Sequence, residues 1–143
     1  MIRKYEITEP IPIPQDCAIT KISVERDYMI FTFEHELYTH ESIQAIHPSA
    51  NSLTLRFHLT RYPGMDVYRL YSGIYSRFRQ GYRLLKEQSL LRLAGQQDTP
   101  LKYLYHFVGS REMVIHLRAK KNYALYVCAD SVEFCWIESQ KYL

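Results

Sequence analysis

The sequence predicts an α+β fold: one antiparallel sheet of about five or six strands, with a long helix and a short helix inserted between the third and fourth strands. Apolar residues alternate with polar ones near both ends of the chain, which is typical of half-buried strands. In the middle they recur at spacings of three and four, which is typical of one side of a helix. A partly open β-barrel with helices is the alternative. With 143 residues, 47% of them hydrophobic, a single domain over residues 1–143 is expected.

Residues 1–16 are expected to form an extended, proline-rich N-terminal arm. Pro10, Pro12 and Pro14 stand at alternate positions, and each fixes φ and removes an amide donor. This excludes a central strand and favours a polyproline-like conformation on the surface of the domain.

The first strands follow the arm. Residues 17–36 alternate on both sides of a turn near Arg26 and Asp27, which predicts an antiparallel hairpin. Thr39 is a candidate N-cap of a short helix that ends at Pro48. Residues 53–59 alternate again and predict a third strand.

A long helix is expected from Asp66, its N-cap, to a stop at Gly95. Its apolar stripe consists of Val67, Tyr71, Ile74, Phe78, Tyr82 and Leu85. Gly73 and Gly81 each cost about 1 kcal/mol relative to alanine inside a helix. A break near Gly73, with residues 67–71 as a strand, therefore stays open.

The short helix between strands is expected from Thr99, followed by Pro100 at the first helical position, to Gly109. Three strands are expected after it, at residues 112–118, 122–129 and 132–138. The last two are predicted to pair as a hairpin around Asp130 and Ser131.

Positive charge is concentrated in residues 56–92, where eight lysines and arginines against two acids give +6, although the whole chain carries +3. Residues 1–55, with four bases and eight acids, sum to −4. Tyrosines and Phe78 are interleaved with the bases. Because arginine and aromatic residues are enriched at interfaces, this segment predicts a contact surface for an acidic protein or a nucleic acid, whose carboxylates or phosphates arginine can bind.

The expected long helix would carry this surface beside its buried stripe. The candidate binding residues are Arg77, Arg79, Arg83, Lys86, Leu84 and Leu91. The two leucines lie off the stripe, and exposed leucines need a partner, for which a homodimer is the simplest solution. The alternative is an amphipathic helix whose basic residues are only solvated.

No catalytic residue, metal site or cofactor is predicted. Glu34, Glu36, His40 and Glu41 are metal-ligand types, but Gln44 occupies the place of the second histidine in H-E-x-x-H. The five glycines form no phosphate-binding loop. His58, His106 and His116 lie in separate apolar segments without a neighbouring nucleophile, so structural roles are expected for them.

Three features of the sequence predict the cellular compartment. No stretch approaches the roughly 20 apolar residues of a membrane span, and the first residues do not read as a secretory leader. Cys17, Cys128 and Cys135 are a sparse, odd set, which favours reduced thiols in the cytoplasm. The sequence predicts a non-catalytic cytoplasmic interaction or regulatory domain that self-associates; nucleic-acid binding is the alternative, and an enzyme of unknown class the third possibility.

Overall fold

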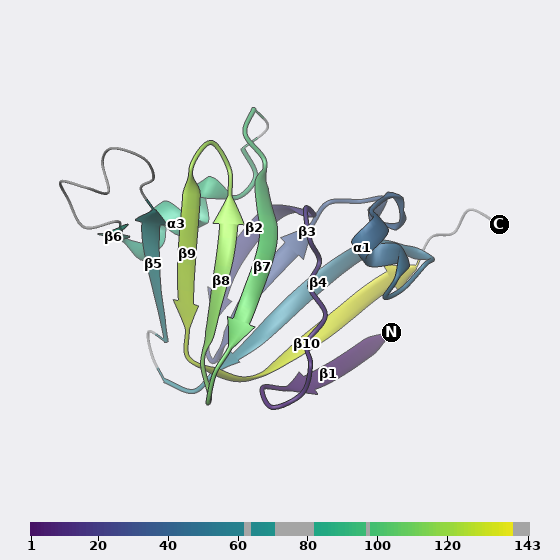
Figure 1. The fold of residues 1–143 in the computed structure, drawn as a ribbon, viewed down its shortest axis with the longest axis horizontal. Coiled ribbons are helices and arrows are strands. Elements are labelled where there is room, and N and C mark those ends of the chain that lie inside the picture. The colour runs from purple at the N-terminus through teal and green to yellow at the C-terminus, as the bar shows by residue number, and fades with distance from the viewer. Residues whose placement is uncertain (62–63, 71–81, 97, 139–143) are drawn as a thin grey trace.

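A computed structural model describes residues 1–61, 64–70, 82–96 and 98–138 (Figure 1). These residues form ten strands in one antiparallel sheet of order β1-β10-β4-β3-β2-β7-β8-β9-β5-β6. The strands are β1 (Ile2–Glu6), β2 (Ala18–Glu25), β3 (Tyr28–Phe33), β4 (Ala50–Leu59), β5 (Met65–Leu70), β6 (Tyr82–Leu85), β7 (Leu101–Val108), β8 (Met113–Arg118), β9 (Asn122–Val127) and β10 (Ala129–Glu138). The helices are η1 (Leu37–Thr39), α1 (Glu41–Gln44) and α3 (Glu87–Leu93).

The sheet folds into two half-sheets that enclose the core between them (Figure 1). The first half-sheet comprises β1, β10, β4, β3 and β2, and the second comprises β7, β8, β9, β5 and β6. Two residue pairs join them through β2 and β7: Ala18 with Lys102 and Ile19 with Leu101. Such short pairing lets the two halves turn sharply relative to each other.

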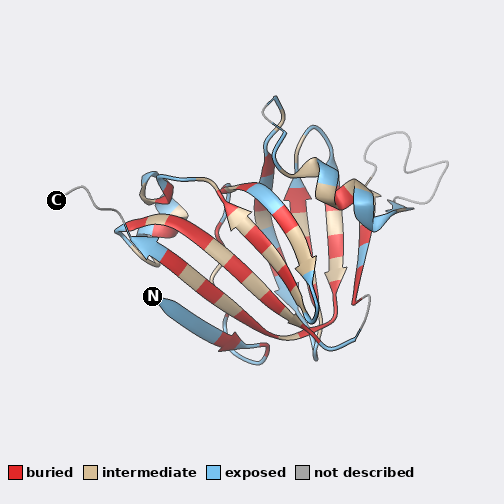
Figure 2. Ribbon diagram, turned by 180° about the vertical axis from the view of Figure 1, so that it is seen from behind, coloured by how far each residue is buried: buried red, intermediate tan, exposed pale blue. Residues whose placement is uncertain are grey.

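The core forms where the inner faces of the half-sheets meet. In β4, Leu53, Leu55 and Phe57 are buried while the residues between them are half-buried, and Figure 2 shows this banding along the strands. The rings of Phe31 in β3 and Tyr103 in β7 lie 6.4 Å apart across the core. Each fully buried side chain of this size contributes about 1.5–3 kcal/mol.

The N-terminal arm closes one side of this core. β1 pairs with β10 at the edge of the sheet, and the chain then crosses to β2 in an extended conformation, as its prolines predict. Ile7 and Ile11 on this segment are buried in the core. The arm is therefore part of the packed interior rather than only a surface strap.

The predicted α+β fold is wrong. The described residues form a ten-stranded sheet with three short helices, and its edge strands, β1 and β6, are not paired with each other as they would be in a closed barrel. Where a long helix was expected, the described residues form β5, β6 and α3, and residues 71–81 lie outside the described ranges. The alternative of a strand at residues 67–71 is confirmed as far as Leu70, where β5 ends; Tyr71 lies outside the described residues.

The short helix expected after Thr99 is also wrong, since these residues form β7. A register shift between Tyr103 and Tyr105 leaves Leu104 as an extra residue in the strand. The inward positions therefore run from Leu101 to Tyr103 and then to His106. A bulge thus produces the spacing of three that resembles a helix.

The expected hairpin at Asp130 and Ser131 is wrong as well, because β9 and β10 do not pair. Cys128 alone separates them, and the chain passes there from the second half-sheet to the first. The hairpin of β2 and β3, the third strand β4 and the strand positions of β8, β9 and β10 are confirmed. In the described part of the chain, no helix has both the length and the apolar character needed to cross a bilayer.

Candidate functional site

The residues that the sequence singled out do not share a helical surface. Arg77 and Arg79 lie outside the described residues. Arg83 and Leu84 are exposed on β6, the edge strand, and Lys86 is exposed just before α3. Leu91 in α3 is partly buried and packs against the core. Of the two leucines, Leu84 alone is available to a partner, with 58% of its surface exposed.

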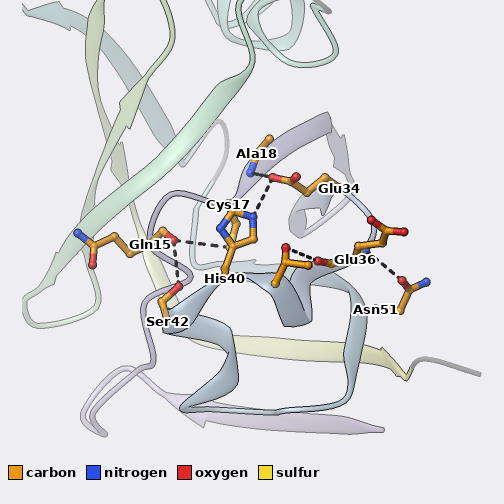
Figure 3. A network of polar contacts seen from close by, with 9 residues as sticks. Gln15, Cys17, Ala18, Glu34, Glu36, His40, Ser42 and Asn51 are labelled. Atoms are coloured by element: carbon orange, nitrogen blue, oxygen red, sulfur yellow. Dashed lines mark hydrogen bonds and ion pairs between the residues drawn. The ribbon is translucent and has the colours of Figure 1, made fainter. Parts of the chain in front are cut away.

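Polar side chains around Glu34 join the arm to the short helices, as Figure 3 shows. The Glu34 carboxylate accepts a hydrogen bond from the Ala18 amide at 2.5 Å and lies 3.6 Å from Nε2 of His40. The Ser42 hydroxyl donates to the Gln15 carbonyl at 2.9 Å. Among the described residues, no group of three or more histidine, cysteine or acidic side chains could hold a metal ion. The network therefore has an evident structural role.

Cys17 belongs to the same region and is fully buried. Its burial, reinforced by the charge of Glu34, raises the pKa of its thiol to about 12. Because the thiolate is the nucleophilic form, Cys17 is inert at neutral pH despite the nearby His40. All three cysteines are free thiols, as the sequence predicted.

The outer face of the first half-sheet carries two ion pairs. Arg56 in β4 lies 2.9 Å from a carboxylate oxygen of Glu133 in β10, and its guanidinium lies 4.2 Å above the ring of Tyr28. Beside it, Nδ1–H of His58 donates to Asp130 at 2.8 Å. Partial burial acts to raise the pKa of Asp130, but the hydrogen bond and charge of His58 outweigh it and lower that pKa. These charges are already paired with one another, which favours a stabilising role.

The outer face of the second half-sheet has a different character, because it is rich in exposed rings. The strand register places two rows of side chains on it. We call these residues the aromatic face: Tyr105, His116, Tyr68 and Leu84 in one row, and Phe107, Val114 and Tyr126 in the other. Phe107 is 64% exposed and Tyr105 40% exposed. The exposed rings of Tyr105 and Phe107 make this outer face the candidate binding surface of the described sheet.

The rings of the aromatic face are ordered by contact with one another. Tyr105 and His116 stack with their centroids 4.5 Å apart and their planes at 18°. Phe107 meets both edge-on, at 5.5 Å from Tyr105 and 6.1 Å from His116. Partial burial lowers the pKa of His116, so at neutral pH its ring is uncharged and suited to stacking.

A cluster of cations borders this face. We call Lys102, Arg118, Lys120 and Lys121 the basic rim. All four are exposed at one end of β7, β8 and the β8–β9 turn. None of them forms an ion pair with any residue that the structure describes. The rim therefore offers free positive charge beside the rings.

Charge also separates between the halves of the molecule. Residues 1–59 and 129–138, which include the first half-sheet, contain five lysines and arginines and eleven acids. The second half-sheet belongs to residues 64–70, 82–96 and 98–128, which contain nine lysines and arginines and four acids. The asymmetry along the sequence thus corresponds to two parts of the fold, and the aromatic face lies in the positive part.

Sequence reasoning missed most of the aromatic face because it assigned residues 99–109 to a helix. Leu101, Tyr103, Tyr105 and Phe107 alternate with period two, which indicates a strand. That pattern alone would have put Tyr105 and Phe107 on the buried face, because it does not show the extra residue at Leu104. The rings of Tyr105 and His116 are brought together only by pairing of β7 with β8. Comparison of the chain with family models, curated proteins and solved structures finds no match.

Proposed function

We propose that this protein is a non-catalytic domain that binds single-stranded nucleic acid on its aromatic face. The observation that carries the proposal is an ordered set of rings, the exposed Tyr105 and Phe107 with the half-buried His116, next to four cations that form no ion pair with any described residue. Unpaired bases stack on aromatic side chains, and lysine and arginine beside them bind the phosphates. Single-stranded nucleic acid as the ligand, together with the three free thiols, suits a cytoplasmic location.

The dimensions of the surface fit several nucleotides. Neighbouring strands lie about 4.8 Å apart, so the distance across the sheet from β7 to β5 is roughly 14 Å. A strand rises about 3.3 Å per residue, so the distance along β7 from Lys102 of the basic rim to Phe107 is roughly 16 Å. A single strand can cross this area with its bases on the rings and its phosphates toward the basic rim. A duplex hides its bases in the stack, so the rings favour single strands.

Fluorescence anisotropy with a labelled oligonucleotide of about 10 nucleotides at about 50 mM salt tests the proposal. Phe107→Ala should weaken binding by about 1–3 kcal/mol because one base loses its stacking partner. Ile137→Ala is the matched control, since Ile137 is 58% exposed on the first half-sheet. Binding should also weaken as salt rises, with a slope that falls by about 0.7 for each rim cation removed.

The same experiment distinguishes an acidic protein as the partner. An acidic peptide competes for the basic rim but gains nothing from ring stacking, so its binding should not depend on Phe107. Absence of oligonucleotide binding at about 50 mM salt, where electrostatic attraction is strong, would eliminate the proposal.

Self-association is a second candidate function. Leu84 is exposed on β6, and no described strand pairs with the other side of β6. A second copy can extend a sheet at such an edge. Sedimentation equilibrium should then show a dimer that Leu84→Glu dissociates, whereas Glu at the equally exposed Ile137 should leave it intact. A monomer at high micromolar concentration contradicts this candidate.

A further inference from the structure

A pocket of about 370 Å³ adjoins the basic rim where β7 meets β2. Its lining combines charges of both signs with a hydroxyl and three apolar side chains: Lys102, Arg118, Asp16, Asp98, Thr99, Pro100, Leu104 and Ala119. The volume falls within the range of about 300–1,000 Å³ typical of small-ligand sites. Leu104 immediately precedes Tyr105 of the aromatic face, so the pocket lies at the end of the row of rings.

The two cations of the pocket stand in an arrangement that a bound anion would stabilise. Lys102 and Arg118 are direct partners across β7 and β8. Like charges placed directly opposite each other destabilise a sheet, and neither side chain is neutralised by an ion pair within the described residues. A phosphate between them removes the repulsion, and the arginine fork can hold it with two hydrogen bonds.

The two carboxylates make the pocket unsuited to a simple anion. Asp16 has a positive φ of 65°, and its backbone N–H donates to the Tyr103 carbonyl at 2.8 Å, which anchors it at the wall of the pocket. Carboxylates accept hydrogen bonds from ribose hydroxyls in nucleotide sites. A ligand that satisfies Asp16, Asp98 and both cations must carry hydroxyl donors as well as a phosphate.

We propose that this pocket binds the 3′-terminal nucleotide of an RNA strand, an inference that rests on the proposed function and refines it. The 5′-phosphate of that nucleotide lies between Lys102 and Arg118, and its 2′- and 3′-hydroxyls donate to Asp16 and Asp98. Among the nucleotides of an RNA or DNA strand, only a 3′-terminal ribonucleotide offers two adjacent hydroxyls together with one phosphodiester. The neighbouring bases then continue onto Tyr105 and the other rings.

Anisotropy with three strands of one base sequence tests this inference: RNA with a 3′-hydroxyl, the same RNA with a 3′-phosphate, and DNA. The 3′-hydroxyl RNA should bind at least about 10-fold more tightly than either other strand, because each of those loses one hydroxyl that donates to a carboxylate. The 3′-phosphate RNA lacks the free 3′-hydroxyl, and DNA lacks the 2′-hydroxyl. Asp98→Asn should reduce this preference. Lys102→Gln should weaken all three strands, while Lys21→Gln on the exposed part of the first half-sheet serves as the control.

The outcomes separate the inference from the proposed function. Equal affinity for the three strands, with binding still weakened by Phe107→Ala, overturns end recognition and leaves the aromatic face as the binding surface. Preference for the 3′-hydroxyl RNA that Asp98→Asn and Asp16→Asn leave unchanged also contradicts the pocket assignment. If the unmodified protein binds none of the three strands, both the end recognition and the proposed function are overturned.

Discussion

The tautomer of His106 is fixed by its two partners in the core. The Ile11 carbonyl can only accept a hydrogen bond, so Nε2 of His106 carries the proton and donates across 3.1 Å. Nδ1 is then an acceptor for the Tyr103 hydroxyl at 2.5 Å. Neutral His106 thereby satisfies Tyr103 and ties the N-terminal arm to β7. A second proton on the ring would turn Nδ1 into a donor, so the buried Tyr103 O–H would lose the acceptor that it has in neutral His106.

Stability should consequently fall in mild acid. Burial lowers the pKa of His106 below its ordinary value of 6.5, against a smaller opposing effect of the Ile11 hydrogen bond. The unfolded chain therefore takes up a proton more readily, and the free energy of unfolding should drop as pH falls below about 6.5, by at most about 1.4 kcal/mol per pH unit for this group.

Urea unfolding at a series of pH values between about 7.5 and 5.5 measures this effect. The pKa of His116 is lowered too, so His116→Phe provides a comparison that removes only the other histidine. The free energy of unfolding should depend less on pH in His106→Gln than in the unmodified protein. In His116→Phe it should still show the pH dependence that His106 contributes. A pH profile that His106→Gln leaves unchanged contradicts the lowered pKa of His106.

Among the elements, β7 shows why local patterns misled. A strand buries every second residue, but the extra residue at Leu104 shifts the phase, so Tyr103 and His106 both point inward. Thr99 and Pro100 also form a favourable helix start. Pairing with β8 along almost the whole strand outweighs these local preferences, since tertiary packing routinely overrides propensity. The residues of β7 alone do not indicate that β7 pairs with β8, and this pairing determines its structure.

The turn after α3 depends on Gly95, which has a positive φ of 81°. A Cβ there would lie 2.8 Å from the backbone oxygen of Thr20 in β2, which cannot move without disturbing the strand. Gly95→Ala should therefore destabilise the protein by about 1–3 kcal/mol, from the strained backbone and the contact together.

Gly109→Ala is the control for this substitution. Its Cβ would meet the flexible Glu112 side chain at 3.1 Å, and no positive φ is needed there. Thermal unfolding of both variants should show a clear decrease in Tm for Gly95→Ala and a small one for Gly109→Ala. Equal effects would show that the contact with Thr20 does not constrain the turn.

For the whole molecule, the sequence predicted the charge asymmetry, the β2–β3 hairpin and most strands. It could not predict which strands become neighbours. Tyr68, Tyr105 and His116 are up to 48 residues apart in the chain and share a face only because β5, β9, β8 and β7 lie side by side. The aromatic face is therefore a product of sheet order, which local periodicity does not encode.

The separation of charge between the half-sheets should guide where a polyanion first meets the protein. The acidic first half-sheet repels phosphates, whereas the basic rim attracts them. In the proposed function, stacking on the rings then adds a short-range contribution that does not depend on salt. Electrostatic attraction and stacking thus act at the same face of the molecule.

The most direct test of the central claim is titration of the isotope-labelled protein with a single-stranded RNA, followed by NMR of each backbone amide. The account predicts that shifts concentrate at Tyr105, Phe107 and His116 and at the adjoining basic rim. Amides around Arg56 and Glu133, on the outer face of the first half-sheet, should be unaffected. Shifts centred on that other face, or no shifts at saturating RNA in low salt, would contradict the claim.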